Sequence, residues 1–139
     1  MAGLLLVGAA GPFDIALLST TAAPNAAGRA RLYFRDSPFG VSVTPEGVGS
    51  YNVRVEADGL PAPASLGGYA VYLAWAATPD LSTWHRLGTV SNGTSTVGPV
   101  TENKFLFVVT AESDSTSATR TGPTVLHGIS PSSWLQSLL

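Results

Sequence analysis

Apolar residues recur at every second position in three short runs in the first half of this chain. The runs cover residues 29–35, 39–44 and 51–56, and in each of them apolar side chains alternate with polar or small ones. A period of two is typical of a strand with one buried face and one exposed face. Residues 45–47 (PEG) have the composition of a turn, so we expect the second and third runs to pair as a hairpin.

A nearly continuous apolar run follows in the middle of the chain. Residues 69–77 (YAVYLAWAA) have almost no polar side chain, which is typical of a strand covered on both faces. The larger side chains stand mostly at odd-numbered positions and alanines at even-numbered ones, so a second surface can approach the alanine side closely. The preceding residues 60–68 (LPAPASLGG) are rich in Pro and Gly, and we expect them to cross between sheets in an extended form.

A turn signal and two further apolar runs complete the strand pattern. Asn92-Gly93 separates residues 87–90 from residues 95–100, and this dipeptide predicts a tight hairpin turn because both residues tolerate positive φ. Residues 104–110 and 124–129 are the last two expected strands.

These segments amount to seven or eight short strands without a long helix. That pattern predicts an all-β fold, an immunoglobulin-like antiparallel β-sandwich. A chain of 139 residues is about the length of one domain. We place the sandwich at residues 26–129, an apolar arm and linker at residues 1–25, and a C-terminal anchor at residues 130–139.

Composition and charge narrow the possible functions. Only 12% of the residues are charged and 45% are hydrophobic, so we expect some apolar surface to face a partner. The net charge is −2 and Lys104 is the single lysine, which argues against nucleic-acid binding. The chain has no cysteine, which excludes disulfides, zinc–thiolate sites and thiol catalysis.

The first 18 residues, MAGLLLVGAAGPFDIALL, are apolar but fit neither a signal peptide nor a membrane span. No Lys or Arg precedes the short apolar stretch, and Gly11-Pro12 interrupts it. A spanning helix needs about 20 continuous apolar residues. We therefore expect an arm that lies against a partner or the membrane interface, with packing on its own domain as the alternative. A further alternative is that Met1 is not the true start and that an export signal lies upstream of it.

The C-terminus has a similar apolar character. Ser130 has the composition of a helix N-cap, Pro131 suits the first helical turn, and Trp134, Leu135, Leu138 and Leu139 follow at helical spacing. Such a short helix is not stable alone in water, so it must dock on the sandwich or on a partner.

Three arginines form the clearest charged cluster. Arg29, Arg31 and Arg35 share one face of the first alternating run. They are either a solvated face or a contact for an acidic subunit or anionic lipid headgroups, because the guanidinium fork suits carboxylates and phosphates.

Residues capable of catalysis or metal binding are scattered. His85 and His127 fall on different expected strands with no carboxylate at a recurring spacing, which favours edge positions over a metal site. Glu112 and Asp114 lie near a Ser/Thr-rich segment that indicates a solvated loop. We therefore expect no catalytic residue, no metal and no cofactor.

Several motifs resemble a known family. The runs "YAVYLAWAATPD", "HRLGTV", "KFLFVVTAES" and "GPTVLHGISPS" resemble the extracytoplasmic C-terminal domain of the anti-sigma-K factors, over residues 69–130. Ser113-Asp114-Ser115 departs from the Gly-Gly of that family. The blocks "SPFGVSVTPEG" and "GISPS" resemble related bacterial exported domains, among them membrane-extrinsic accessory subunits of photosynthetic reaction-centre and light-harvesting complexes. The resemblance implies a non-enzymatic extracytoplasmic module.

Together these observations predict a structural subunit, peripheral to the membrane on its periplasmic side, that holds subunits of a membrane-protein complex together. Lipid headgroups are a further expected contact, and nucleic acids and small-molecule substrates are not. A sensing domain of the anti-sigma-factor type and a small-ligand-binding domain are the alternatives. The residues expected at the partner interface are Leu4, Leu5, Leu6, Val7, Phe13, Ile15, Leu17, Leu18, Arg29, Arg31, Arg35, Trp134, Leu135, Leu138 and Leu139.

Overall fold

A computed structural model describes residues 14–34, 51–101 and 104–130 of the chain. In these ranges the fold is all-β and antiparallel, as predicted, and its only helical element is a 3-10 turn at Pro63–Leu66. The strands are β1 (Asp14–Ser19), β2 (Ala27–Phe34), β3 (Tyr51–Asp58), β4 (Val71–Ala77), β5 (Trp84–Val90), β6 (Gly93–Val100), β7 (Leu106–Glu112) and β8 (Thr124–Ile129).

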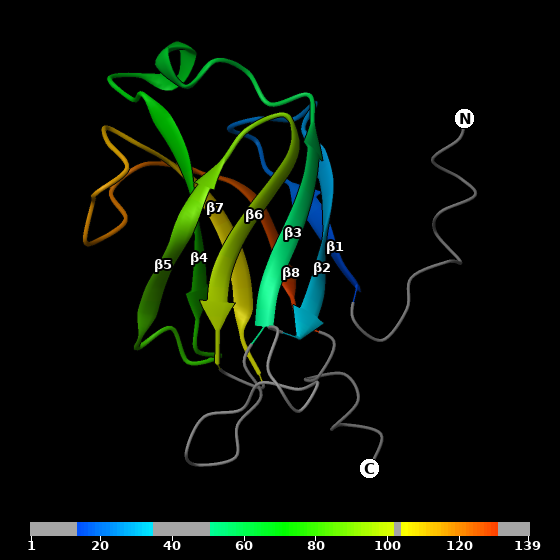
Figure 1. The fold of residues 1–139 in the computed structure, drawn as a ribbon. Helices are drawn as coiled ribbons and strands as arrows, with labels where there is room; N and C mark the ends of the chain where they lie inside the picture. The colour runs from blue at the N-terminus through cyan, green and yellow to red at the C-terminus, as the bar shows by residue number, and fades with distance from the viewer. Residues whose placement is uncertain (1–13, 35–50, 102–103, 131–139) are drawn as a thin grey trace, which may run out of the picture.

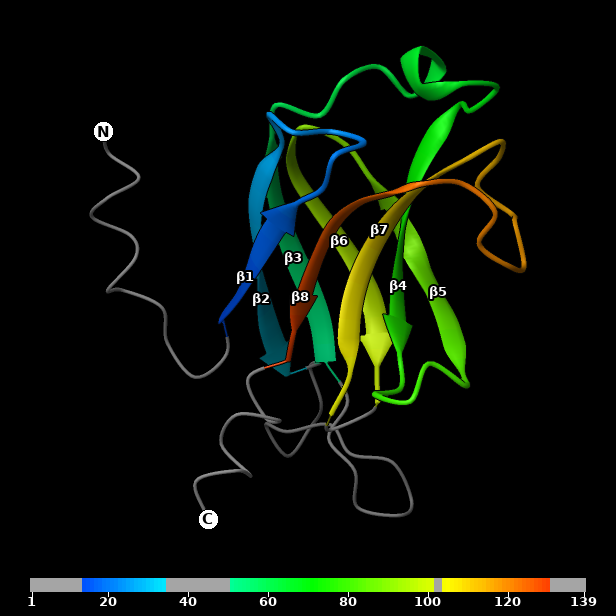
Figure 2. The ribbon, with the colours of Figure 1, turned by 180° about the vertical axis from the view of Figure 1, so that it is seen from behind.

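The eight strands form one nearly closed sheet in the order β5-β4-β7-β8-β1-β2-β3-β6. The sheet folds into two layers, with β2, β3 and β6 in one and β5, β4, β7 and β8 in the other (Figure 1). Strand β1 joins the layers, because its first four residues pair with β2 and its last two pair with β8 (Figure 2). The ends of this order, β5 and β6, lie next to each other without strand pairing between them.

The hydrophobic core fills the space between the layers. Its largest fully buried members include Ile15, Val53, Phe105, Phe107 and Leu126. Strands β1, β2, β3, β4 and β7 contribute alternate residues to it, as expected from the period of two.

Strand β4 is buried on both faces, which confirms the expectation for the apolar run. Tyr72, Ala74 and Ala76 belong to the core between the layers, so the small side chains allow the opposite layer to approach. Leu73 and Trp75, on the other face of the strand, are also completely buried.

The predicted hairpin between residues 39–44 and 51–56 is wrong. Strand β3 pairs with β2 along its whole length on one edge and with β6 on the other edge. Both edges are therefore occupied, and no edge is left for the run at 39–44, which lies outside the described residues.

The structure also corrects the boundary of the N-terminal arm. Residues 14–19 are strand β1, and residues 20–26 form two consecutive turns in which Ala23 and Ala26 are buried. The segment is a strand because Ile15 and Leu17 alternate with more exposed neighbours, a period of two within an otherwise apolar stretch. The sandwich thus includes residues 14–25, and residues 1–13 and 131–139 lie outside the described residues.

The Asn92-Gly93 turn is present, but it does not join the two strands of a hairpin. Gly93 has φ = 94°, while β5 and β6 belong to opposite layers. Where they pass each other, a Cβ on Gly88 would lie 3.1 Å from the side chain of Val97, so a larger residue would push the layers apart. Residues 60–68 cross between the layers as expected, with the 3-10 turn in place of a fully extended path.

Candidate functional site

The exposed face of β1, β2 and β3 gathers most of the charged side chains predicted to bind a partner. Because Ala30 and Leu32 point into the core, their neighbours on β2 point outward, and the same alternation on β3 turns Arg54 and Glu56 outward. We call this surface the arginine face. It consists of Asp14, Arg29, Arg31, Tyr33, Arg54 and Glu56.

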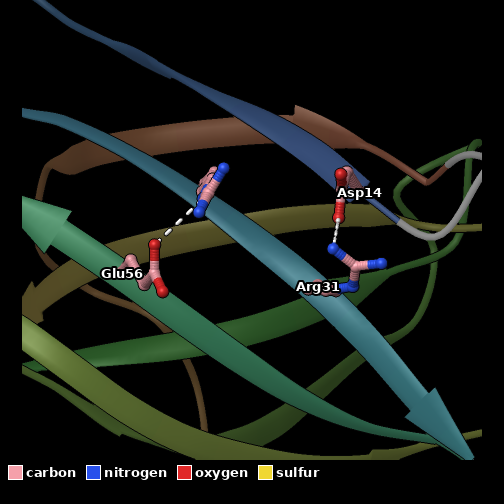
Figure 3. Close-up of polar contacts among 4 residues, drawn as sticks. Asp14, Arg31 and Glu56 are labelled. Carbon is pink, nitrogen blue, oxygen red and sulfur yellow. Dashed lines mark hydrogen bonds and ion pairs between the residues drawn. The ribbon is translucent and has the colours of Figure 1, made fainter. Parts of the chain in front are cut away.

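Two ion pairs cross the arginine face. Arg29 Nε lies 2.9 Å from Glu56 Oε1, and both side chains are about half exposed, at 48% each. Arg31 Nη1 lies 3.5 Å from Asp14 Oδ1 (Figure 3). The strand register explains both pairs, because Arg29 stands opposite Glu56 and Arg31 stands opposite Asp14.

Two residues along β2 from the Arg29–Glu56 pair, two arginines stand at opposite positions of neighbouring strands. Arg31 on β2 stands directly opposite Arg54 on β3. The Arg54 guanidinium lies over the ring of Tyr33, 4.9 Å from its centroid, and Tyr33 is 40% exposed. Within the described ranges, no carboxylate lies within ion-pair distance of Arg54.

The structure places five of the predicted interface residues. Arg29 and Arg31 are exposed, and Leu18 is exposed to 59%. Ile15 and Leu17 are 1% and 5% exposed in the core of their own domain, so they are not available to a partner, which corrects their assignment. The other predicted residues lie outside the described ranges: Leu4, Leu5, Leu6, Val7, Phe13, Arg35, Trp134, Leu135, Leu138 and Leu139.

Arg54 and Tyr33 belong to the arginine face but were not predicted. Arg54 alternates with Val53 and Val55, so the sequence shows that it points outward. Its position opposite Arg31 depends on the pairing of β2 with β3. This pairing was not predicted, because residues 51–56 were expected to pair with residues 39–44.

The two histidines lie on separate strands. His85 is on β5 and His127 on β8, with β4 and β7 between them. Across the described part of the chain, no three His, Asp or Glu side chains gather in a way that could hold a metal ion.

Glu112 is fully buried, and its assignment to a solvated segment was wrong. Its carboxylate accepts hydrogen bonds from Thr110 Oγ1 (2.6 Å), Thr121 Oγ1 (2.8 Å) and the backbone N–H of Thr121 (3.1 Å). Burial, the largest single effect, raises the pKa of Glu112, but the hydrogen bonds from Thr110, Thr121 and Gly122 together outweigh it and lower that pKa below its ordinary value. Since every carboxylate oxygen has a donor, this group stabilises the fold and is not aimed at a ligand.

Ser130 was predicted to cap a helix that lies outside the described residues. In the structure it is buried, and it pairs with Phe105 in both directions. Its backbone N–H donates to the Phe105 carbonyl (2.9 Å), and its Oγ accepts from the Phe105 N–H (3.1 Å).

An open groove of about 680 Å³ lies where residues 60–63 pass the edges of β4, β5 and β6. Its lining combines Pro61 and Pro63 with the polar residues Thr89, Asn92 and Thr96, and it holds no charged residue. One wall is fixed by the Tyr72 hydroxyl, which donates to the Pro61 carbonyl at 2.7 Å.

Comparison with protein-family models, curated proteins and solved structures finds no match to this chain. No helix among the described residues is long and apolar enough to span a bilayer.

Proposed function

We propose that this protein is a non-enzymatic structural subunit that docks on a membrane-protein complex from its extracytoplasmic side. Bacterial photosynthetic reaction centres with their antennae are one candidate complex, suggested by the motif resemblance. The apolar segments at both ends of the sequence and the low content of charged residues support docking over chemistry.

The observation that carries this proposal is the arginine face. It offers three guanidinium groups, an exposed tyrosine and, at the end of β1, the exposed Leu18 on one continuous part of the sheet. Arginine and tyrosine are enriched at protein interfaces because each combines a large contact area with hydrogen bonding.

A truncation pair tests the proposal. Because β1 begins at Asp14, the N-terminal deletion must stop at residue 12; a longer deletion would remove a strand of the sheet. Variants lacking residues 1–12 or 132–139 should keep the melting temperature of the full chain but dissociate from detergent-solubilised native membrane complexes. Full retention of both variants, or absence of the full chain from every membrane complex, would contradict the proposal.

The groove supports small-ligand binding as a second candidate function. Its hydroxyl and amide groups beside apolar walls suit a neutral ligand. An NMR screen with neutral fragments should then shift the amide resonances of Thr89 and Thr96 in a saturable way. Shifts spread evenly over the surface would exclude this function.

A further inference from the structure

The rows of side chains that cross the arginine face differ in charge balance. In one row, Ala16, Arg29, Glu56 and Thr94 stand side by side, so the charges cancel. In the next row the order is Asp14, Arg31, Arg54 and Thr96, which leaves one positive charge in excess. Like charges directly opposite each other destabilise a sheet, so the Arg31–Arg54 row lowers the stability of the fold by a repulsion that the first row does not have.

Arg31 and Arg54 each contact one neighbouring side chain, and both arginine side chains stay exposed to solvent. Asp14 approaches Arg31 from the β1 side, and its side chain is only 10% exposed, while that of Arg31 is 54% exposed. The Tyr33 ring supports Arg54 from the diagonal position on β2. A guanidinium over an aromatic face keeps its N–H donors free in its own plane, where a carboxylate can accept two parallel hydrogen bonds.

From this geometry we propose that Arg31 and Arg54 together form a carboxylate-binding site for an acidic segment of a partner protein. A Glu or Asp side chain between the two guanidinium groups would remove the like-charge repulsion and place the partner's backbone beside Tyr33. The proposal rests on the proposed docking function and identifies the chemistry of the partner.

The surrounding charges favour a protein carboxylate over an anionic membrane. Asp14 and Glu56 flank the two arginines, and the whole chain has a net charge of −2 with a single lysine. A flat anionic surface would meet the half-exposed Glu56 carboxylate as well as the arginines. A single acidic side chain can contact the two guanidinium groups alone.

The test uses the full chain and a hexaglutamate peptide with blocked ends, with hexaglutamine as the neutral control. The side-chain Nε resonances of Arg31 and Arg54 should shift in a saturable way with hexaglutamate and stay unchanged with hexaglutamine. The variant Arg54→Gln should bind hexaglutamate about tenfold more weakly, the loss expected for charge-assisted hydrogen bonds.

Arg120→Gln is the matched control. Arg120 also lies over an aromatic ring, that of Trp84 at 3.9 Å, but outside the arginine face, so this variant should bind hexaglutamate as the unaltered chain does. The melting temperatures of both variants should stay close to that of the unaltered chain.

Two results of the binding experiments would overturn the site. One is an equal affinity for hexaglutamate in the unaltered chain and Arg54→Gln. The other is Arg54-dependent binding to phosphatidylglycerol-containing vesicles without any response to hexaglutamate, which would assign the pair to lipid headgroups. If the terminal truncations release the protein from its complex while Arg54→Gln does not, the docking function stands and the carboxylate site alone is rejected.

Discussion

The indole N–H of Trp75 donates a 2.9 Å hydrogen bond to Thr110 Oγ1, and both side chains are completely buried. The Thr110 hydroxyl donates in turn to Glu112, whose carboxylate accepts from the Thr121 and Gly122 backbone. This chain of hydrogen bonds fixes β4 to β7 and fixes β7 to the segment that leads into β8. A buried polar network of this kind rigidifies the fold when every member has a partner.

Replacing Glu112 with Gln tests the charged end of this network. The amide retains one acceptor oxygen but turns a donor toward the donors of Thr121, so we expect the free energy of unfolding to fall by about 2 kcal/mol. Urea denaturation measures the change. Asp114→Asn, an exposed carboxylate two residues away, is the control and should have a much smaller effect. Equal effects of the two substitutions would contradict the network.

The pKa of Glu112 predicts how stability depends on pH. The pKa is lowered in the folded state from an ordinary value of 4.5, so the ionised carboxylate stabilises the fold above that pH, and the contribution is lost as the pH falls through the folded-state pKa. The free energy of unfolding should therefore decrease more steeply in the unaltered chain than in Glu112→Gln between about pH 6 and pH 3. Parallel pH profiles for the two proteins would show that the folded and unfolded pKa values are equal.

Thr110→Val tests the coupling within the network. Valine has nearly the shape of threonine, but it leaves the Trp75 N–H without an acceptor and removes a donor to Glu112, so we expect a loss of about 2 kcal/mol. The double variant with Glu112→Gln should lose less than the sum of the single losses, by more than about 0.5 kcal/mol, because the two residues share a hydrogen bond. Strict additivity would show that they act independently.

Asn92 connects the turn between β5 and β6 to the segment after β3. Its Oδ1 accepts from the Leu60 N–H at 2.9 Å, and its Nδ2 donates to the Leu60 carbonyl at 3.0 Å. Asn92→Ala removes both bonds, so we expect a loss of about 1.5 kcal/mol in chemical denaturation. Ser91→Ala, at the neighbouring exposed position, should change stability by less than about 0.5 kcal/mol. A loss in Ser91→Ala as large as that in Asn92→Ala would contradict a specific role for the amide.

Short-range patterns predicted the strands well. The last expected strand, residues 124–129, has the observed bounds, and the expected burial of both faces of residues 69–77 holds over β4. Such patterns are local, because alternation and turn residues act over a few positions. The strand at residues 14–19 was missed because its alternation sits within a mostly apolar stretch that also fits an arm.

Contacts between residues far apart in the chain could not be predicted from local sequence patterns. The pairing of β3 with both β2 and β6 involves residues up to about 50 positions apart, and no local pattern specifies it. For the same reason, the sequence did not predict that Arg54 stands opposite Arg31 or that Glu112 is buried. All donors to the Glu112 carboxylate except Thr110 come from a segment nine or ten residues later. The arginines of β2 were identified correctly as an exposed cluster, but their partners come from other strands.

Site-specific photocrosslinking in native membranes tests docking through the arginine face most directly. A benzoylphenylalanine residue in place of Ala16, which is exposed beside Arg29, should crosslink to an acidic segment of a membrane-complex subunit, and Arg54→Gln should reduce the yield. The same photoreactive residue in place of Leu81, which is 50% exposed in the turn before β5, should give no such product. Equal crosslinking from both positions, or none from position 16, would contradict docking through this face.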